Sequence, residues 1–395
     1  MIQLAILGFG VVGGGVAQVL AQNGAQLARQ LGEPLAVKSI LVRRFQEGAY
    51  RARMTDDFKV IEQDPSIRVV IETMGGCGAA YDYTKRALAA GKSVVTANKE
   101  LVAEHGRELL ELAACHGVQY LFEASVGGGI PVLYPLTQCM AANRVEEVVG
   151  ILNGTTNYIL TQMSQNGASF AAALREAQDR GYAESDPTAD VEGIDACRKI
   201  CILADLAFGK NVSPTSVPTE GITGLDLRDV KTAEAAGYRV RLLGRAVRLA
   251  DGGRTAYVAP HLVPVSNPLA TVSDVFNAIT VRGNATGDLL FYGKGAGALP
   301  TASAVLSDVG HAVRGGAALH WDADDSSFRD SDSLPLRFYY RIAGRLSDAL
   351  AAFSEIEVLQ EGEETVFLTQ PLSATEAATR AQNLSVLARL RVLGE

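Results

Sequence analysis

A carboxylate and an ammonium stand one helical turn apart in the middle of the sequence. Asp195 and Lys199 are four residues apart in a stretch of helical character, so both side chains are expected on one face. Such a pair can converge on one small polar ligand, or it can be an ion pair in solvent. The helix continues as the apolar run ICILADLAF, and the loop before it carries Glu184, Asp186 and Asp190. These two features favour a polar site at this helix.

A glycine-rich segment, GFGVVGGG, follows the apolar run LAIL and leads into a predicted helix from about Val12 towards Leu31. In this context glycines allow a tight turn, a close approach of the backbone to a pyrophosphate, and close packing of helix on sheet. The helix N-terminus adds unpaired N–H groups that favour phosphate. The residues predicted to bind a dinucleotide here are Gly8, Gly10, Val11, Val12 and Gly13.

The second predicted strand, SILVR, ends in Arg43 and Arg44. No Asp or Glu stands where a carboxylate would bind a ribose 2′-hydroxyl, whereas a guanidinium suits a 2′-phosphate. The alternative is a pair of solvated surface arginines. The pattern favours NADP, with NAD as the other possibility.

Further residues are expected at the carboxyl edge of the same sheet, where open α/β sheets bind ligands. TMGG follows the third strand and TANK follows the fourth, and the later segment GKGAG offers another anion-friendly loop. The alternative for each is an ordinary turn or a solvated lysine. The cofactor-binding candidates from these segments are Gly75, Thr96, Asn98, Lys99 and Gly297.

The elements that must position these residues alternate between strand and helix from Ile2 to about Pro131. This order predicts a doubly wound parallel sheet of the Rossmann type. Longer helices mixed with strands follow, including helices near Phe170 to Arg180 and from about Val191 to Phe208. The predicted division is residues 1–131 with about 300–316 for the dinucleotide domain, 132–299 for a mixed α+β catalytic and oligomerising domain, 317–334 for a linker, and 335–395 for a small α+β module.

The composition excludes several functional classes. Hydrophobic residues make up 48% and charged residues 20% of the 395 residues, so disorder and coiled coil are poor interpretations. A net charge of −8 without a long basic run argues against nucleic-acid binding. The sequence contains no run of eighteen uncharged apolar residues, so no membrane span is predicted. Five cysteines without a C-x-x-C pair, and a start without a signal peptide, favour the cytoplasm.

Long blocks of the sequence resemble the homoserine dehydrogenase family. They are TANK (Thr96 to Lys99), EASVGGGIP (Glu123 to Pro131), GILNGTTNYIL (Gly150 to Leu160), GYAESDPTADVEGIDACRK (Gly181 to Lys199) and GKGAGALPTA (Gly293 to Ala302). The resemblance implies interconversion of L-homoserine and L-aspartate 4-semialdehyde with NAD(P), in threonine and methionine biosynthesis. It further implies a homodimer or homotetramer and the monofunctional form, without a fused aspartate kinase.

The resemblance also implies roles for the polar residues. Lys199 would donate the proton in aldehyde reduction, Asp195 would orient Lys199 and the substrate, and Lys99 would point at substrate or nicotinamide. The substrate ammonium needs a buried carboxylate, and Glu184 is placed to provide it. Asp190 matches a position near the substrate, but it is equally suited to cap the helix from Val191 onward.

A sodium site is implied in EASVGGGIP. The family binds sodium through Glu123 and the carbonyl groups of Val126, Gly128 and Ile130, and a carboxylate followed by glycine-rich backbone suits a hard cation. The ion is expected to be structural rather than part of hydride transfer.

The last sixty residues resemble the ACT module that often follows this enzyme and binds an amino-acid effector, commonly threonine. Between RFYYRI and EIEVLQ, however, the segment AGRLSDALAAFS is short and lacks an Asp-x-Pro-Gly-type turn. A module that only assists association is as good an interpretation as a threonine sensor.

Two other functions fit the same fold. One is a non-catalytic NADP-binding regulator, against which the set Lys99, Glu184, Asp195 and Lys199 argues. The other is a related amino-acid semialdehyde dehydrogenase. A version that forms an acyl intermediate would need an activated cysteine, for which Cys77 is the weak candidate.

Overall fold

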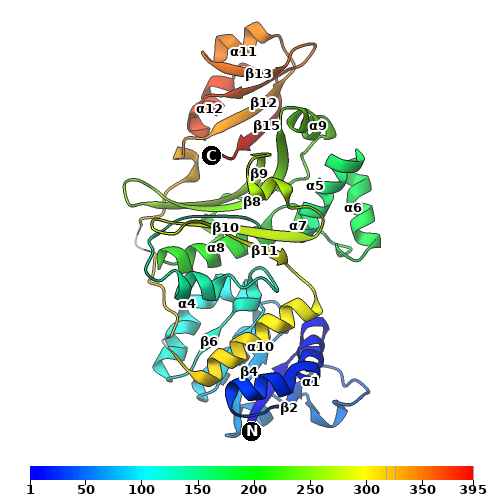
Figure 1. Ribbon diagram of the computed structural model, residues 1–395, viewed down its shortest axis with the longest axis vertical. Helices are drawn as coiled ribbons and strands as arrows, with labels where there is room; N and C mark the ends of the chain where they lie inside the picture. The colour runs from blue at the N-terminus through cyan, green and yellow to red at the C-terminus, as the bar shows by residue number, and fades with distance from the viewer. Residues whose placement is uncertain (317, 325, 395) are drawn as a thin grey trace. The chain divides into compact units, whose positions relative to one another are not determined.

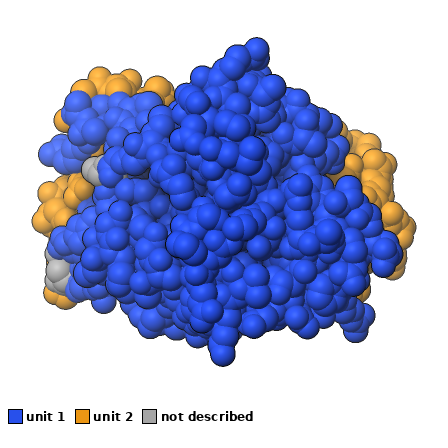
Figure 2. Space-filling model, turned by 90° about the horizontal axis from the view of Figure 1, so that it is seen from below, with its two compact units in different colours: residues 1–144, 201–214, 291–324 blue, residues 145–200, 215–290, 325–395 orange. Residues whose placement is uncertain are grey.

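The computed structural model describes residues 1–316, 318–324 and 326–394. The chain divides into two compact units, coloured separately in Figure 2. The first unit comprises residues 1–144, 201–214 and 291–324, and the second comprises 145–200, 215–290 and 325–395. The predicted linker and C-terminal module include residues 317, 325 and 395, which lie outside the described residues. The domain boundaries given by the sequence analysis stay a prediction.

The first unit is built on a parallel sheet of six strands, counted among the described residues, in the order β3-β2-β1-β4-β5-β6. This order confirms the predicted doubly wound sheet, whose strand order reverses between β1 and β4. The strands are β1 (Ile2–Leu7), β2 (Leu35–Leu41), β3 (Met54–Thr55), β4 (Ile67–Glu72), β5 (Ser93–Thr96) and β6 (Tyr120–Leu121).

Helices cover this sheet, and α1 packs beside α10 in Figure 1. The core between them is apolar: Ile6 of β1, Val16 of α1 and Val305 of α10 are all fully buried. The α-helices of the unit are α1 (Val11–Leu31), α2 (Lys59–Glu62), α3 (Gly78–Ala89), α4 (Lys99–Cys115) and α10 (Ala298–Arg314). Short helical turns lie at Arg51–Arg53 and Glu123–Ser125, with a π-helical turn at Pro135–Cys139.

A nine-stranded sheet belongs mainly to the second unit, in the order β11-β10-β7-β8-β9-β15-β12-β14-β13 among the described residues. The neighbouring pairs β10–β7, β7–β8 and β8–β9 are antiparallel, and β8 and β9 form a long hairpin. The strands are β7 (Val145–Ile151), β8 (Tyr238–Arg248), β9 (Arg254–Pro264), β10 (Phe276–Gly283), β11 (Gly287–Lys294), β12 (Arg337–Ile342), β13 (Ile356–Gln360), β14 (Thr365–Thr369) and β15 (Val386–Val392).

The remaining helices are α5 (Gly154–Asn166), α6 (Phe170–Asp179), α7 (Thr188–Val191), α8 (Ile194–Phe208), α9 (Leu227–Ala235), α11 (Leu346–Ala352) and α12 (Ala374–Ala381). Short 3-10 turns lie at Pro214–Ser216, Pro268–Thr271 and Ser331–Ser333. The continuous helix expected from Val191 to Phe208 is wrong. Gly193 has φ of +80° and separates α7 from α8, because a left-handed residue interrupts a right-handed helix.

The C-terminal part follows the predicted order of strand, helix, hairpin, helix and strand. β12, β13, β14 and β15 form one end of the nine-stranded sheet, and Tyr340, Phe353 and Phe367 are buried together beneath α11 and α12. β15 joins β9 through two parallel pairs, Arg391 with His261 and Val392 with Leu262. The order is thus confirmed, whereas the likeness to an effector-binding module stays a prediction.

Candidate functional site

The glycine loop of the first unit has the local structure that a dinucleotide requires. Gly8 has φ of +90°, and a Cβ atom added to Gly13 would overlap the carbonyl oxygen of Gly8. A Cβ atom at Gly15 would lie 2.7 Å from the carbonyl oxygen of Ala298, so this glycine lets α1 approach α10. Gly10 precedes α1 and makes no side-chain cap, which suits an N-terminus that receives a phosphate. These features fit a bound dinucleotide.

A buried carboxylate organises the carboxyl ends of β4 and β5. Glu72 accepts a hydrogen bond from the Thr96 hydroxyl at 2.5 Å and from the Met74 amide at 2.6 Å. The main-chain N–H of Asn98 donates to the Thr96 hydroxyl. The side-chain nitrogen of Asn98 donates to the Gly76 carbonyl oxygen at 2.7 Å. Burial raises the pKa of Glu72, and these hydrogen bonds oppose the shift. The network fixes the two loops that the sequence assigned to the cofactor.

Glu72 was not predicted, although it stands at the end of the strand run VVIETM. Nothing in its spacing distinguishes it from a surface glutamate. By contrast, the predicted Gly75 has φ of +78° in the turn after β4, and Gly297 has φ of +120° just before α10. Lys99 is the first residue of α4 and is half-buried, while Arg43 and Arg44 are exposed just beyond β2. All of these residues lie in the first unit.

The second unit contains a buried polar cluster at the start of α8. The Lys199 ammonium donates to Asp195 Oδ2 at 2.7 Å and to the Leu152 carbonyl oxygen at 2.7 Å. The predicted shared helix face is confirmed, and the two side chains are only 10% and 5% exposed, so the pair lies out of bulk water. Two acceptors, one on α8 and one in the loop after β7, fix the direction of the ammonium.

Asn153 ties this pair to Asp190. Its side-chain nitrogen donates to Asp190 Oδ1 at 2.6 Å and to Asp195 Oδ2 at 2.8 Å, while its oxygen accepts from the Thr156 amide and caps α5. Of the two alternatives for Asp190, the cap of a helix from Val191 onward is contradicted, because Asp190 lies within α7 and α8 begins only at Ile194. Burial raises the pKa of Asp190, and the charge of Asp195 adds to the increase, while the hydrogen bond from Asn153 acts in the opposite direction.

Asn153 was also missed as a functional residue, although it lies in the block GILNGTTNYIL. Its partners are 37 and 42 residues away, so no local pattern indicates the contacts. Glu184 is exposed on the loop after α6, and Gln178 donates to its carbonyl oxygen. The burial expected for this carboxylate is therefore absent from the structure.

Glu123 is buried, and its carboxylate is occupied by backbone donors. Oε1 accepts from the amides of Val132 and Leu133 at 2.6 and 2.9 Å, and Oε2 accepts from Tyr134 at 2.7 Å. Burial raises the pKa of Glu123, and the nearby Asp308 charge adds to the increase. Three N–H dipoles already point at the carboxylate that was expected to bind sodium. A carboxylate can accept about four hydrogen bonds or metal contacts, so the predicted sodium site at Glu123 and the neighbouring main-chain oxygens stays a prediction.

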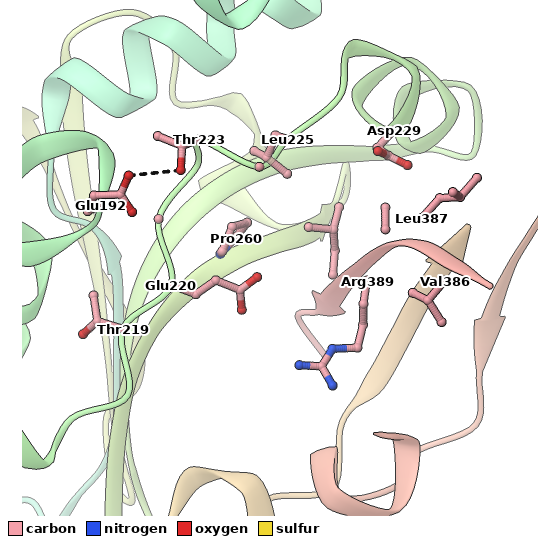
Figure 3. Close-up of a pocket in the computed structure, with 14 residues that line it drawn as sticks. Glu192, Thr219, Glu220, Thr223, Leu225, Asp229, Pro260, Val386, Leu387 and Arg389 are labelled. Carbon is pink, nitrogen blue, oxygen red and sulfur yellow. Dashed lines mark hydrogen bonds between the residues drawn. The ribbon is translucent and has the colours of Figure 1, made fainter. Parts of the chain in front are cut away.

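The second unit also holds a cavity of about 550 Å³. It lies between the segment Thr219–Leu225 and β15, and Figure 3 shows Glu220 and Arg389 on its walls. Glu192 accepts a hydrogen bond from the Thr223 hydroxyl at 3.1 Å at one side. None of the predicted site residues lines this cavity. Separately, no helix among the described residues is long and apolar enough to cross a membrane.

Two family profiles match the chain. The profile described as homoserine dehydrogenase matches residues 131–309, and that described as homoserine dehydrogenase, NAD binding domain, matches residues 8–123. The homoserine dehydrogenase of Neisseria gonorrhoeae is 44% identical over 78% of this chain and 71% of its own. That of Mycobacterium bovis is 41% identical over 90% of this chain and 84% of its own.

Solved structures agree with these relatives. A crystal structure of a homoserine dehydrogenase from Thiobacillus denitrificans is 36% identical, with a TM-score of 0.92, and covers 99% of this chain and 98% of its own. A hyperthermophilic archaeal homoserine dehydrogenase in complex with NADPH is 27% identical, with a TM-score of 0.69, over 81% of this chain and 99% of its own.

Proposed function

The chain belongs to the homoserine dehydrogenase family, and from this we propose that it interconverts L-homoserine and L-aspartate 4-semialdehyde with NADP(H), Lys199 being the proton donor. A bound nicotinamide would supply or accept the hydride at the substrate carbon. The observation that carries the proposal is the buried Lys199–Asp195 pair, held by Leu152 and Asn153. We extend the proposal to a role in threonine and methionine biosynthesis in the cytoplasm, as a homo-oligomer.

Lys199 is proposed to protonate the carbonyl oxygen of the semialdehyde as the hydride arrives. An ammonium donates one proton and becomes a neutral amine, which recovers a proton from water after the alcohol leaves. Asp195 and the Leu152 carbonyl oxygen hold the Lys199 nitrogen in one place, so that little reorganisation is needed during the transfer. In the oxidative direction the same amine accepts the hydroxyl proton.

The substrate ammonium is proposed to bind the carboxylate of Glu184, with Asp190 as the second acidic residue of the site. Glu184 is exposed, so the substrate itself would have to cover it. Asp190 already accepts from Asn153 within the cluster, which favours a role in positioning. Comparing KM for homoserine in Glu184→Gln and Asp190→Asn separates the two roles. Loss of the residue that binds the substrate ammonium should raise KM far more than it lowers kcat.

The dinucleotide is proposed to lie across the Gly8–Gly13 loop, with its 2′-phosphate at Arg43 and Arg44 and its nicotinamide near Gly75, Thr96, Asn98 and Lys99. The exposure of both arginines beyond β2 supports the assignment, since a bound phosphate would neutralise them. The sodium ion stays part of the proposal, bound through Glu123 and the carbonyl groups of Val126, Gly128 and Ile130.

An absorbance assay at 340 nm tests the function directly. We expect NADP⁺ reduction with L-homoserine, with kcat/KM for NADP⁺ above that for NAD⁺. The variant Arg43→Ala should lower the ratio of kcat/KM for NADP⁺ to kcat/KM for NAD⁺, without changing kcat. No homoserine-dependent absorbance change with either cofactor would reject the proposed reaction. A cofactor ratio unaffected by Arg43→Ala and Arg44→Ala would reject only the phosphate assignment.

A further inference from the structure

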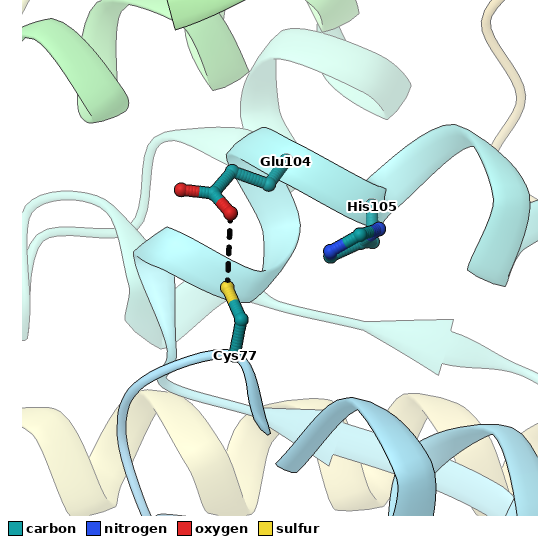
Figure 4. Close-up of side chains that lie close together, drawn as sticks. All are labelled: Cys77, Glu104 and His105. Carbon is teal, nitrogen blue, oxygen red and sulfur yellow. Dashed lines mark hydrogen bonds between the residues drawn. The ribbon is translucent and has the colours of Figure 1, made fainter. Parts of the chain in front are cut away.

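Three metal-ligating side chains lie together in the first unit, outside the residues assigned to the reaction. Cys77 directly precedes α3, and Glu104 and His105 lie in the middle of α4. Figure 4 shows the Cys77 sulfur pointing at the Glu104 carboxylate, with the His105 ring beside them. Cys77 Sγ lies 3.2 Å from Glu104 Oε2, and one ligand atom from each of the three residues lies within 4.8 Å of the others.

Sulfur, nitrogen and oxygen donors of this kind suit a borderline-soft divalent cation. Zn²⁺ and Co²⁺ accept thiolate, imidazole and carboxylate ligands, commonly with a water molecule as the fourth ligand. In a tetrahedral site the ligand atoms are roughly 3.3–3.8 Å apart, so the cluster must contract by about 1 Å. Glu104 is exposed and Cys77 and His105 are only half-buried, so these side chains have room to rotate towards a common centre.

Neighbouring groups favour metal binding at two of the ligands. The His105 ring lies against the Tyr81 ring, with centroids 4.2 Å apart and an interplanar angle of 32°. The Tyr81 hydroxyl in turn donates to Glu108 Oε2 at 2.6 Å, so the platform for the imidazole is itself held. Cys77 stands at the N-terminus of a twelve-residue helix, whose dipole favours a thiolate.

We propose that Cys77, Glu104 and His105 bind one thiophilic divalent cation of the Zn²⁺ class. The Cys77 thiol releases its proton to solvent as the metal–sulfur bond forms, and His105 binds as the neutral imidazole. The site follows the turn of Gly75 and Gly76, whose Gly76 carbonyl oxygen accepts from Asn98. Bound metal therefore restrains a turn that the proposed function assigns to the cofactor, although metal binding itself does not depend on that function.

Cobalt titration of the full, untagged chain after chelator treatment tests the site. A thiolate bound to Co²⁺ gives a charge-transfer band in the near ultraviolet, and tetrahedral Co²⁺ gives intense visible bands. We expect saturation at one Co²⁺ per chain and displacement of Co²⁺ by Zn²⁺. Cys77→Ser should abolish the charge-transfer band, and His105→Gln should weaken Co²⁺ binding at least tenfold. Affinity should fall as pH is lowered, because protons compete for the thiol and the imidazole.

Matched controls come from the C-terminal end of α4. Cys115 and His116 are adjacent and exposed, so Cys115→Ser and His116→Gln remove the same chemical groups away from the cluster. Both controls should bind Co²⁺ like the parent chain, and circular dichroism verifies the fold of every variant. A charge-transfer band that survives in Cys77→Ser, one that disappears in Cys115→Ser, or no band in the parent chain at millimolar Co²⁺ would each overturn the proposal.

Discussion

Two buried ion pairs of the second unit look alike at first and differ in what they can do. Lys199 pairs with Asp195 in α8, and Arg341 of β12 pairs with Asp229 of α9. The shortest nitrogen–oxygen distance is 2.7 Å in each pair. All four side chains are at most 10% exposed. Burial and distance alone therefore do not show which of the two pairs could take part in acid–base chemistry.

The difference lies in the cation. Arg341 binds both oxygens of Asp229 at 2.7 and 3.0 Å and reaches Glu364 at 3.0 Å, while the Tyr339 hydroxyl donates to the same Asp229. These acidic partners raise the pKa of Arg341, and a guanidinium does not release its proton in any case. The Lys199 ammonium, by contrast, can lose a proton and regain it. Residue type, more than burial, decides which pair can take part in acid–base chemistry.

The largest effect should come from removing the Lys199 ammonium. We expect Lys199→Ala to reduce kcat about a thousandfold, equivalent to about 4 kcal/mol, with cofactor affinity nearly unchanged. Steady-state kinetics and cofactor fluorescence titration measure the two quantities. Lys199→Arg keeps the positive charge but not the transferable proton, and should be almost as slow. Turnover within tenfold of the parent enzyme in Lys199→Ala would show that the proton comes from elsewhere.

Breaking the other pair should cost stability instead of turnover. Arg341→Met leaves the Asp229 carboxylate buried without its guanidinium, which should lower the free energy of unfolding by about 3–5 kcal/mol. Urea unfolding measures this loss, and kcat per folded molecule should stay within twofold of the parent value. Replacing both partners, as Arg341→Met with Asp229→Leu, should recover part of the stability. A large fall in kcat for folded Arg341→Met would remove the distinction between the pairs.

Asn153 allows a smaller and more local test. Asn153→Ala removes a helix cap together with donors to Asp190 and Asp195, so we expect about 1–2 kcal/mol less stability and a moderate loss of kcat. Ser169 is the matched control, because its side chain caps α6 by accepting from the Ala172 amide and does not touch the cluster. Ser169→Ala should show the loss of stability alone. Equal kcat values in the two variants would mean that Asn153 only caps α5.

The carboxylates beside the two pairs should have small and opposite effects on pH dependence. Burial raises the pKa of Asp190, so its contribution to folding is lost as pH rises above the unfolded value. Hydrogen bonds from Arg228 lower the pKa of Asp226, so its contribution is lost as pH falls towards 3.8 and below.

Urea unfolding between pH 3 and pH 7 separates these signs. Relative to the parent chain, Asp190→Asn should gain stability as pH rises, whereas Asp226→Asn should lose it. The second effect should stay below about 1 kcal/mol because the Asp226 side chain is 37% exposed, so solvent screens its charge. Asparagine still caps a helix, so Asp226→Asn tests the charge and not the cap of α9. Parallel pH profiles for both variants would contradict the opposite shifts.

The sequence was sufficient for two local features of the site. The i,i+4 spacing predicts the Asp195–Lys199 contact, and the glycine spacing predicts the loop after β1, because both depend only on a helix or a turn forming. Leu152, Asn153 and Glu72 were missed because their contacts join segments 24 to 47 residues apart, and such contacts depend on tertiary packing. The exposure of Glu184 and the amide ligands of Glu123 likewise follow from loop conformations that residue types do not determine.

A crystal structure of the enzyme with NADP⁺ and homoserine tests the central assignment most directly. The proposed reaction requires the Lys199 ammonium to face the oxygen atom of the substrate that gains or loses the proton. The account predicts Lys199 Nζ within about 2.6–3.2 Å of the reacting oxygen, with Asp195 and Leu152 still bound to Lys199. A closed ternary complex in which another residue makes that contact, and Lys199 lies beyond hydrogen-bonding distance, would contradict it.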